Sequence, residues 1–166
     1  MRTTDLLIDG YERIHGVVHS ALDGTSSATL TYRPAPEANT VAWLVWHLTR
    51  VQDDHVSEVA KKEQVWTSEG FYDRFGLPFG VRATGNAQSS DDVAALTTGA
   101  DLLGAYFDAV HARTQAYLAT LSDDDLDRIV DDNWTPPVSL GMRLISVLSD
   151  DLQHAGQAAY LRGLTD

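Results

Sequence analysis

Three polar side chains in two otherwise apolar stretches have the types and spacing of a metal-ligand set. His47 lies in the middle of residues 40–59, TVAWLVWHLTRVQDDHVSEV, whose apolar periodicity predicts a helix. Asp150 and His154 stand four residues apart near the C-terminus, so on a helix they project from one face. A third donor from a facing helix would complete a three-ligand site with open positions, and His47 is the natural choice. Such a donor set suits Zn²⁺, Ni²⁺ or Fe²⁺, with zinc the default.

The same residues also have simpler interpretations. An Asp–His pair at this spacing is an ordinary ion pair on many solvated helices, and a lone histidine on an apolar face is usually a hydrogen-bonded core residue. Trp43 and Trp46 lie shortly before His47 in the sequence and would exclude water, which favours an unprotonated imidazole. Spacing alone therefore leaves the metal hypothesis and the structural interpretations open.

The remaining histidines are weaker candidates. His15 and His19 share the four-residue spacing, but on a helical wheel His15 lies at the edge of the apolar stripe and His19 lies further round. We interpret both as boundary histidines, which lie between the apolar and the polar face of their helix. His55 lies about 80° from His47 on the helical wheel, and we interpret it in the same way. His111 could face the core, and nothing beside it in the sequence resembles a ligand set.

The composition restricts the chemistry of any such site. The chain has no cysteine, so it has no thiolate ligand and no thiol nucleophile of its own. A net charge of −12 argues against nucleic acid as a partner, because phosphate binding requires a basic surface. No apolar run has the length of a membrane span and no signal-peptide pattern is present, so we expect a cytoplasmic protein without a membrane partner. Nucleophile-elbow, P-loop and dinucleotide-binding motifs are absent.

The 166 residues predict a single domain, residues 1–166, of all-α class. Helices are expected at 4–22 after an N-cap at Thr3 or Thr4, from Asn39 or Thr40 to about residue 63, at about 91–121 with a break near 97–99, and at 140–161 between Ser139 and Gly163. Together they predict an antiparallel four-helix bundle. Residues 64–90 form a long irregular connection rich in aromatic residues, which we expect either to cover one end of the bundle as a pocket wall or to pack as a satellite of the core.

Two segments carry a resemblance to a known family. TVAWLVWHLTRVQDDH and NWTPPVSLGMRLISVLSDDLQHAGQAAYLRGL resemble the DinB-like superfamily, most closely the branch of mycothiol-dependent maleylpyruvate isomerases and their bacillithiol-using relatives. The likeness extends over nearly the whole chain and is strongest at WHL and H-x-G-x-x-x-x-L-R. It implies an up-down-down-up bundle, often dimeric, that holds a divalent metal.

The resemblance also implies which residues bind that metal. His47 matches the histidine on the second helix, and Asp150 and His154 match the pair of donors on the last helix. Relatives have Glu or His at the position of Asp150, whose arm is shorter than that of Glu, so the two histidines are the more firmly implied ligands. Gln157 stands where close relatives often have a further histidine, and could contact the site or the substrate.

The implied activity is that of a metal-dependent thiol transferase or isomerase. A mycothiol-type thiol would be the cosubstrate, held as a thiolate by the metal, and a small molecule would be the other substrate. Asp54, Arg50 and Gln157 are then candidate catalytic or substrate-contacting residues, with the substrate between the metal and the aromatic segment 66–79. Two alternatives stay open: a metal-dependent hydrolase that uses the same open site, and a non-catalytic, stress-associated dimeric bundle.

Overall fold

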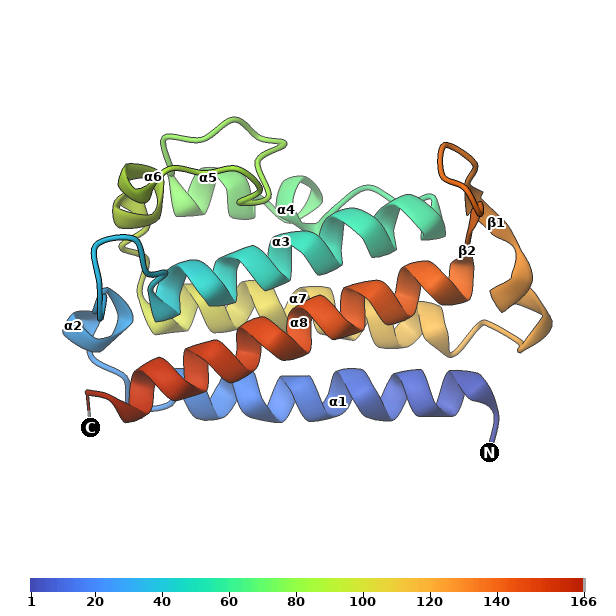
Figure 1. The fold of residues 1–166 in the computed structure, drawn as a ribbon, viewed down its shortest axis with the longest axis horizontal. Coiled ribbons are helices and arrows are strands. Elements are labelled where there is room, and N and C mark those ends of the chain that lie inside the picture. Colours follow the sequence, from blue (N-terminus) through green and yellow to red (C-terminus); the bar gives the residue numbers. More distant parts are fainter. Residues whose placement is uncertain (166) are drawn as a thin grey trace.

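Four long helices form the bundle in the computed structural model, which describes residues 1–165 (Figure 1). They are α1 (Thr3–Leu22), α3 (Val41–Ala60), α7 (Ala100–Leu118) and α8 (Leu140–Gly163). Helices α1 and α8 run in one direction and α3 and α7 in the other, which confirms the predicted all-α, up-down-down-up class. Helix α8 packs against α3 and α1, and α7 packs against the same two helices. The α3–α8 and α1–α7 contacts therefore lie on opposite sides of the bundle.

The connection between α3 and α7 returns along the bundle, because these two helices run in parallel (Figure 1). It contains α4 (Val65–Ser68), α5 (Phe71–Phe75) and α6 (Ser90–Ala95). The carboxylate of Asp53 in α3 accepts hydrogen bonds from the backbone N–H groups of Val65 (2.9 Å) and Trp66 (2.8 Å), which ties the first turn of α4 to the bundle. Three aromatic residues of the connection are buried in the core: Trp66, Phe71 and Phe75. This arrangement favours the satellite-core interpretation for these residues.

Three helix ends differ from the prediction. Arg2, and not Thr3 or Thr4, is the N-cap of α1; its backbone N–H donates to the Asp5 carboxylate (2.9 Å). Helix α3 ends at Ala60 and not near residue 63, because Lys61 has the left-handed φ of 55° that stops a helix. Helix α8 includes Gly163, which was expected to end it.

The shorter elements connect the bundle ends. Helix α2 (Ser27–Leu30) lies in the loop after α1, and a 3-10 turn, η1 (Asp124–Asp127), follows α7. Strands β1 (Ile129–Asp131) and β2 (Val138–Ser139) then pair antiparallel before α8. Ser139 caps α8 as predicted, since its hydroxyl accepts from the Met142 N–H (3.3 Å). Within the described residues, no helix is long and apolar enough to cross a membrane.

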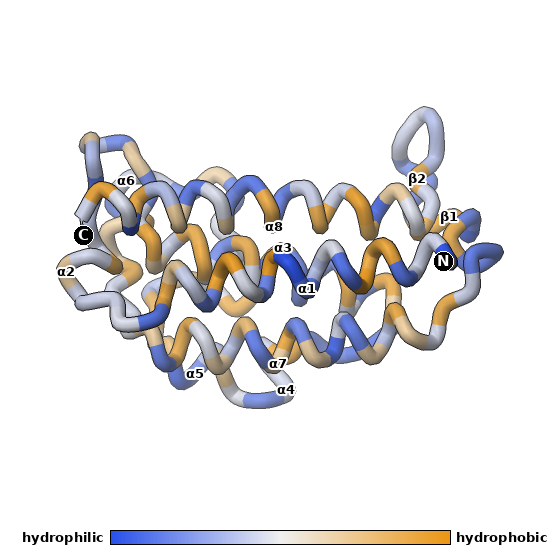
Figure 2. The backbone as a smooth tube through the Cα atoms, turned by 90° about the horizontal axis from the view of Figure 1, so that it is seen from below, coloured by the Kyte–Doolittle hydropathy of each residue, from blue (hydrophilic) through white to orange (hydrophobic). Residues whose placement is uncertain are grey.

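The apolar core consists of two clusters that meet near the middle of the bundle. Apolar residues recur about once per turn along each long helix, between polar residues, as expected of amphipathic helices (Figure 2). On α3 the first cluster ends at Leu48 and the second begins at Val56; on α8 the second ends at Val147 and the first resumes at Ala155. The polar residues of the candidate site lie at this junction between α3 and α8.

Candidate metal centre

His47 of α3 and Asp150 and His154 of α8 come together in the folded chain. One potential ligand atom of each lies within 4.8 Å of the other two. His154 Nε2 is 3.6 Å from Asp150 Oδ1, and the two imidazole centroids are 4.8 Å apart with the rings steeply inclined. Around a tetrahedral ion with bonds of about 2.0–2.2 Å, ligand atoms lie roughly 3.3–3.6 Å apart. Small side-chain rotations would therefore bring all three donors to one ion.

Each of the two histidines has its Nδ1 atom engaged by a neighbouring oxygen. His47 Nδ1 faces the carbonyl oxygen of Thr84, which can only accept, so Nδ1 carries the proton. His154 Nδ1 lies 3.0 Å from Gln157 Oε1 and donates to it in the same way. Both rings are thus held in the tautomer that leaves Nε2 with a free lone pair, which is the usual arrangement of a metal-binding histidine.

The protonation of His47 also suits a ligand. Its burial lowers its pKa below the usual range, and the nearby His154 lowers this pKa further. These effects outweigh the hydrogen bond to Thr84 and the charge of Asp150, which act in the opposite direction. His47 is therefore neutral at physiological pH, and only a neutral imidazole can coordinate a metal.

A tight contact between α3 and the loop before α6 fixes the His47 ring. Trp43 stacks against one side of the imidazole, with centroids 4.6 Å apart and an angle of 15° between the planes. Gly85 approaches from the loop with φ of 103°, and a Cβ atom there would lie 2.5 Å from His47 Nδ1. Only glycine allows this approach, which brings the neighbouring Thr84 carbonyl within reach of the ring.

The surroundings of Asp150 indicate whether these residues fit a metal ion. Its Oδ2 atom is buried and has no hydrogen-bond partner among the described residues, which is costly for a carboxylate. An ion bound between Asp150 and the two histidines would supply the missing partner. The shorter arm of Asp is sufficient here, since Oδ1 is already 3.6 Å from His154 Nε2. The donor set therefore fits a divalent ion.

A cavity of about 390 Å³ opens beside these donors, between α3, α8 and the Thr84 loop. His55, interpreted from the sequence as a boundary residue, lines this cavity one turn beyond Val51. Its Nδ1 accepts from Arg143 (3.1 Å), so the remaining Nε2–H is a donor available to a ligand. Burial lowers the pKa of His55, and the positive charge of Arg143 lowers it further. The helical wheel did not single out His55, because it lies about 80° from His47 on α3. The cavity is nevertheless lined by His47, Val51, Asp54 and His55 of α3, with Thr84, Asn86, Ser146, Val147 and Asp150.

The three candidate contact residues have different surroundings. Asp54 lines the cavity, and its Oδ1 accepts from Gln64 Nε2 (2.6 Å). Gln157 contacts His154, as described above. Arg50 is 0% exposed inside the bundle, where it donates to the Ala83 carbonyl and to the Tyr106 hydroxyl (3.0 and 3.1 Å). The structure does not bring Arg50 to the cavity, because its side chain leaves α3 towards the connection and α7.

The other histidines do not join this site. His15 and His19 are partly exposed on α1, as expected of boundary residues, but both contact Asp108 of α7. His111, beside which the sequence shows no ligand set, gains such neighbours from another helix in the folded chain: its ring lies 4.4 Å from that of His15, and its Nε2 is 3.1 Å from a carboxylate oxygen of Glu12. The sequence did not show this cluster because its members come from two helices.

An up-down-down-up bundle with two histidines and a carboxylate converging between its second and last long helices defines a DinB-like protein. The family model described as mycothiol-S-transferase matches residues 11–166, and the chain belongs to this family. A crystal structure of a conserved protein from Enterococcus faecalis is similar, with a TM-score of 0.90 and 30% sequence identity over 98% of this chain and 96% of that one. A comparison with curated proteins found no match to the chain. Family membership associates the chain with mycothiol-transferase-like, metal-associated chemistry.

Proposed function

We propose that the chain is a divalent-metal-dependent S-transferase or isomerase that uses a low-molecular-weight thiol of the mycothiol type. The observation that carries the proposal is the convergence of His47, Asp150 and His154, with both imidazoles oriented to leave Nε2 free. The cysteine-free composition supports it, since any thiol nucleophile must come from a cosubstrate. Zinc is the default ion for two histidines and one carboxylate, with nickel or iron as alternatives.

The roles of the residues follow from their positions. His47, Asp150 and His154 would hold the ion, with Gln157 and the Thr84 carbonyl orienting the two rings. A divalent ion held by these three residues would stabilise a thiol as its thiolate, the nucleophilic form, at neutral pH.

We assign Asp54 and His55 to the polar part of the ligand, because both line the cavity beside the donors. Asp54 offers a carboxylate acceptor, and His55 offers an N–H donor whose tautomer is set by Arg143. Together they would position the thiol or its acceptor relative to the open side of the site.

Metal analysis and thiol-dependent turnover test the proposal. Untagged protein is expected to bind a divalent ion at this centre, and His47→Ala and His154→Ala should each bind one ion fewer than the wild type. Gln153→Ala, an exposed change on the same helix as His154, should keep the ion. Mycothiol should then support transfer to an electrophile in the wild type and in Gln153→Ala, but not in the two histidine variants. Absence of metal binding at these residues would refute the proposal.

The same assay separates the alternatives. Turnover of esters or amides without any thiol, lost in the same histidine variants, would identify a hydrolase. Metal binding without any turnover would favour the non-catalytic bundle.

We also propose that the chain forms a homodimer through α8. Four large apolar residues on one face of this helix are 49–68% exposed: Met142, Ile145, Leu152 and Tyr160. Spacings of three, seven and eight residues place them within about 80° of one another on the helix. Light scattering after gel filtration measures the mass directly, and Leu152→Glu should shift a dimer to the monomer.

A further inference from the structure

A second row of metal-binding residue types lies on the opposite side of the bundle, between α1 and α7. Helix α1 contributes Glu12, His15 and His19, whose spacings of three and four place them on one face. Helix α7 contributes Asp108 and His111, three residues apart. The two helices are antiparallel neighbours, so the two rows face each other. None of these residues takes part in the site proposed above.

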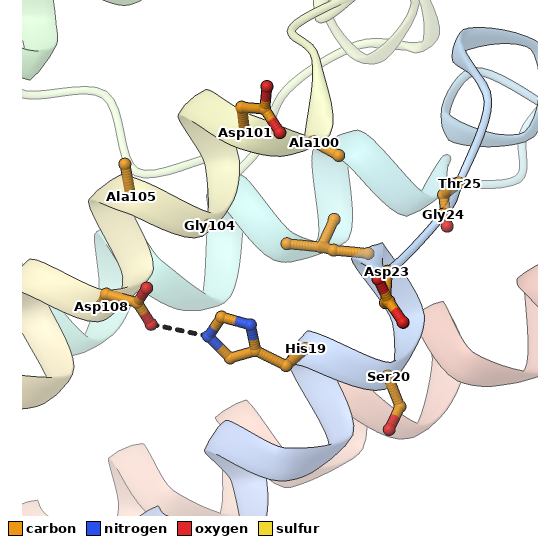
Figure 3. Close-up of a pocket in the computed structure, with 11 residues that line it drawn as sticks. His19, Ser20, Asp23, Gly24, Thr25, Ala100, Asp101, Gly104, Ala105 and Asp108 are labelled. Atoms are coloured by element: carbon orange, nitrogen blue, oxygen red, sulfur yellow. Dashed lines mark hydrogen bonds and ion pairs between the residues drawn. The ribbon is translucent and has the colours of Figure 1, made fainter.

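Two imidazoles in this row converge on one carboxylate oxygen. His15 Nε2 lies 2.9 Å and His19 Nε2 lies 2.6 Å from Asp108 Oδ1, and the two rings are 4.4 Å apart. Figure 3 shows the His19 ring directed from α1 towards Asp108 of α7. One potential ligand atom of each of the three residues lies within 4.8 Å of the other two. The donor set, two histidines and one aspartate, is the same as at the first centre.

Packing behind these donors restrains them. The ring of Phe107 stacks on the His15 ring with 23° between the planes. The largely buried His111 also lies against the His15 ring. A carboxylate oxygen of Glu12 forms a hydrogen bond with His111 Nε2. His111 Nδ1 is buried without a hydrogen-bond partner among the described residues. Partial burial of Asp108 would raise its pKa, but the hydrogen bonds from His19 and His15 outweigh this effect and keep the carboxyl ionised.

An open groove gives an ion access to this cluster. It has a volume of about 730 Å³ and extends from His19 and Asp108 towards the end of α1 (Figure 3). Asp23 and Asp101 also line it, so the groove carries several negative charges that attract cations. His19 and Asp108 are 43% and 49% exposed, so a hydrated ion reaches them without an opening of the fold.

We propose that His15, His19 and Asp108 form a second site for a divalent transition metal, which links α1 to α7. Histidine nitrogens and one carboxylate suit Zn²⁺, Ni²⁺ or Cu²⁺ over Mg²⁺ or Ca²⁺. The ion takes the place of the two Nε2–H protons that now point at Asp108, and its remaining positions face the groove. Binding therefore releases protons, or moves them to Nδ1, and weakens as the pH falls. The site is independent of the proposed thiol chemistry, because it lies between other helices.

Zinc titration of untagged protein, followed by native mass spectrometry, tests the second site. We expect two ions per wild-type chain, one in His19→Ala and one in His47→Ala, and none when the two substitutions are combined. Gln153→Ala, an exposed change outside both donor sets, is the control, and it should still bind two. His19 is partly exposed, so we expect its replacement to leave the fold intact, which circular dichroism verifies.

NMR identifies the ligands directly. Added Zn²⁺ should shift the ring resonances of His15 and His19 in the His47→Ala variant, where the first centre has been removed. The proposal is overturned if His19→Ala binds as many ions as the wild type, or if these two rings do not respond to zinc. If His47→Ala binds as many ions as the wild type while His19→Ala binds one fewer, the first centre is refuted and the second one stands.

Discussion

Replacement of Gly85 by alanine should disable the metal centre while the bundle still folds. Gly85 belongs to no helix and donates nothing to a metal ion, so its effect would come only from its contact with His47. An added Cβ would lie 2.5 Å from His47 Nδ1 and 3.0 Å from Trp43 Cζ2. Neither ring can retreat easily, since Trp43 is buried and His47 is stacked against it.

The size of the effect follows from this overlap. Carbon and nitrogen atoms in contact normally lie about 3.5–4.0 Å apart, so the loop or the ring must move by roughly 1 Å. Metal–ligand distances tolerate only about 0.2 Å, and loss of a group that orients a ligand typically costs about 10–100-fold in affinity. The φ of 103° adds backbone strain of about 1–3 kcal/mol. Since about 1 kcal/mol shifts the melting temperature of a domain this size by roughly 2–4 °C, the variant stays folded at room temperature.

Two other glycines separate the steric effect from the strain. Gly70 has a φ of 71° with no atom within 4 Å of an added Cβ, so Gly70→Ala introduces strain alone. Gly80 has neither feature, so Gly80→Ala should match the wild type. Zinc affinity measured by competition with a chelator, together with thermal unfolding of the apoprotein, is the assay. Gly85→Ala should lose both affinity and stability, and Gly70→Ala stability only.

Wild-type zinc affinity of Gly85→Ala at the His47 centre would contradict this prediction. Equal losses of affinity in Gly85→Ala and Gly70→Ala would also refute it, because the contact with His47 would then be irrelevant.

Three further predictions concern buried and capping charges. Arg50→Met should lower the free energy of unfolding in urea by about 3–5 kcal/mol, because it leaves the buried Asp53 carboxylate without its neighbouring cation (3.6 Å); a loss below 1 kcal/mol would contradict this. Asp151 is fully buried, and neither of its carboxylate oxygens has a hydrogen-bond partner among the described residues. Burial raises its pKa, and the charge of Asp150 raises it further, so Asp151→Asn should stabilise the apoprotein at pH 7 by about 1–3 kcal/mol. That gain should vanish below the unfolded-state pKa of 3.8, where the wild-type carboxyl is protonated in both states, and a gain independent of pH would exclude this cause. Hydrogen bonds from the Ser89 N–H and hydroxyl lower the pKa of Asp92. The midpoint of the Asp92 titration, measured by NMR, should therefore fall below 3.8. The α6 cap should weaken only as the pH falls through that midpoint.

Local sequence patterns determined the four long helices and the candidate ligands. Apolar residues at helical spacing placed all four long helices, and the caps Thr40 and Ser139 mark the starts of α3 and α8 because such hydroxyls satisfy free N–H groups in the first turn. The four-residue spacing of Asp150 and His154 placed both donors on one face before any fold was known. These are contacts within a few residues of chain, so the sequence contains them directly.

Other features depend on which helices are neighbours, and a helical wheel does not contain that information. The angle between His47 and His55 seemed too large for one site, yet the cavity between α3 and α8 is wide enough to include both. Arg50 is one turn from His47, but α7 and the returning connection bury it on another side.

Tertiary structure alone also decided the contacts made by the irregular segments and by paired helices. The carbonyl that orients His47 comes from Thr84, 37 residues away, and reaches the ring because Gly85 permits the close approach. His15 and Asp108 are 93 residues apart and meet only because α1 and α7 pack as antiparallel neighbours. The sequence thus specified which side chains could bind a metal, whereas helix packing decided which of them share a site, because a ligand set requires donors from separate helices within a few ångströms.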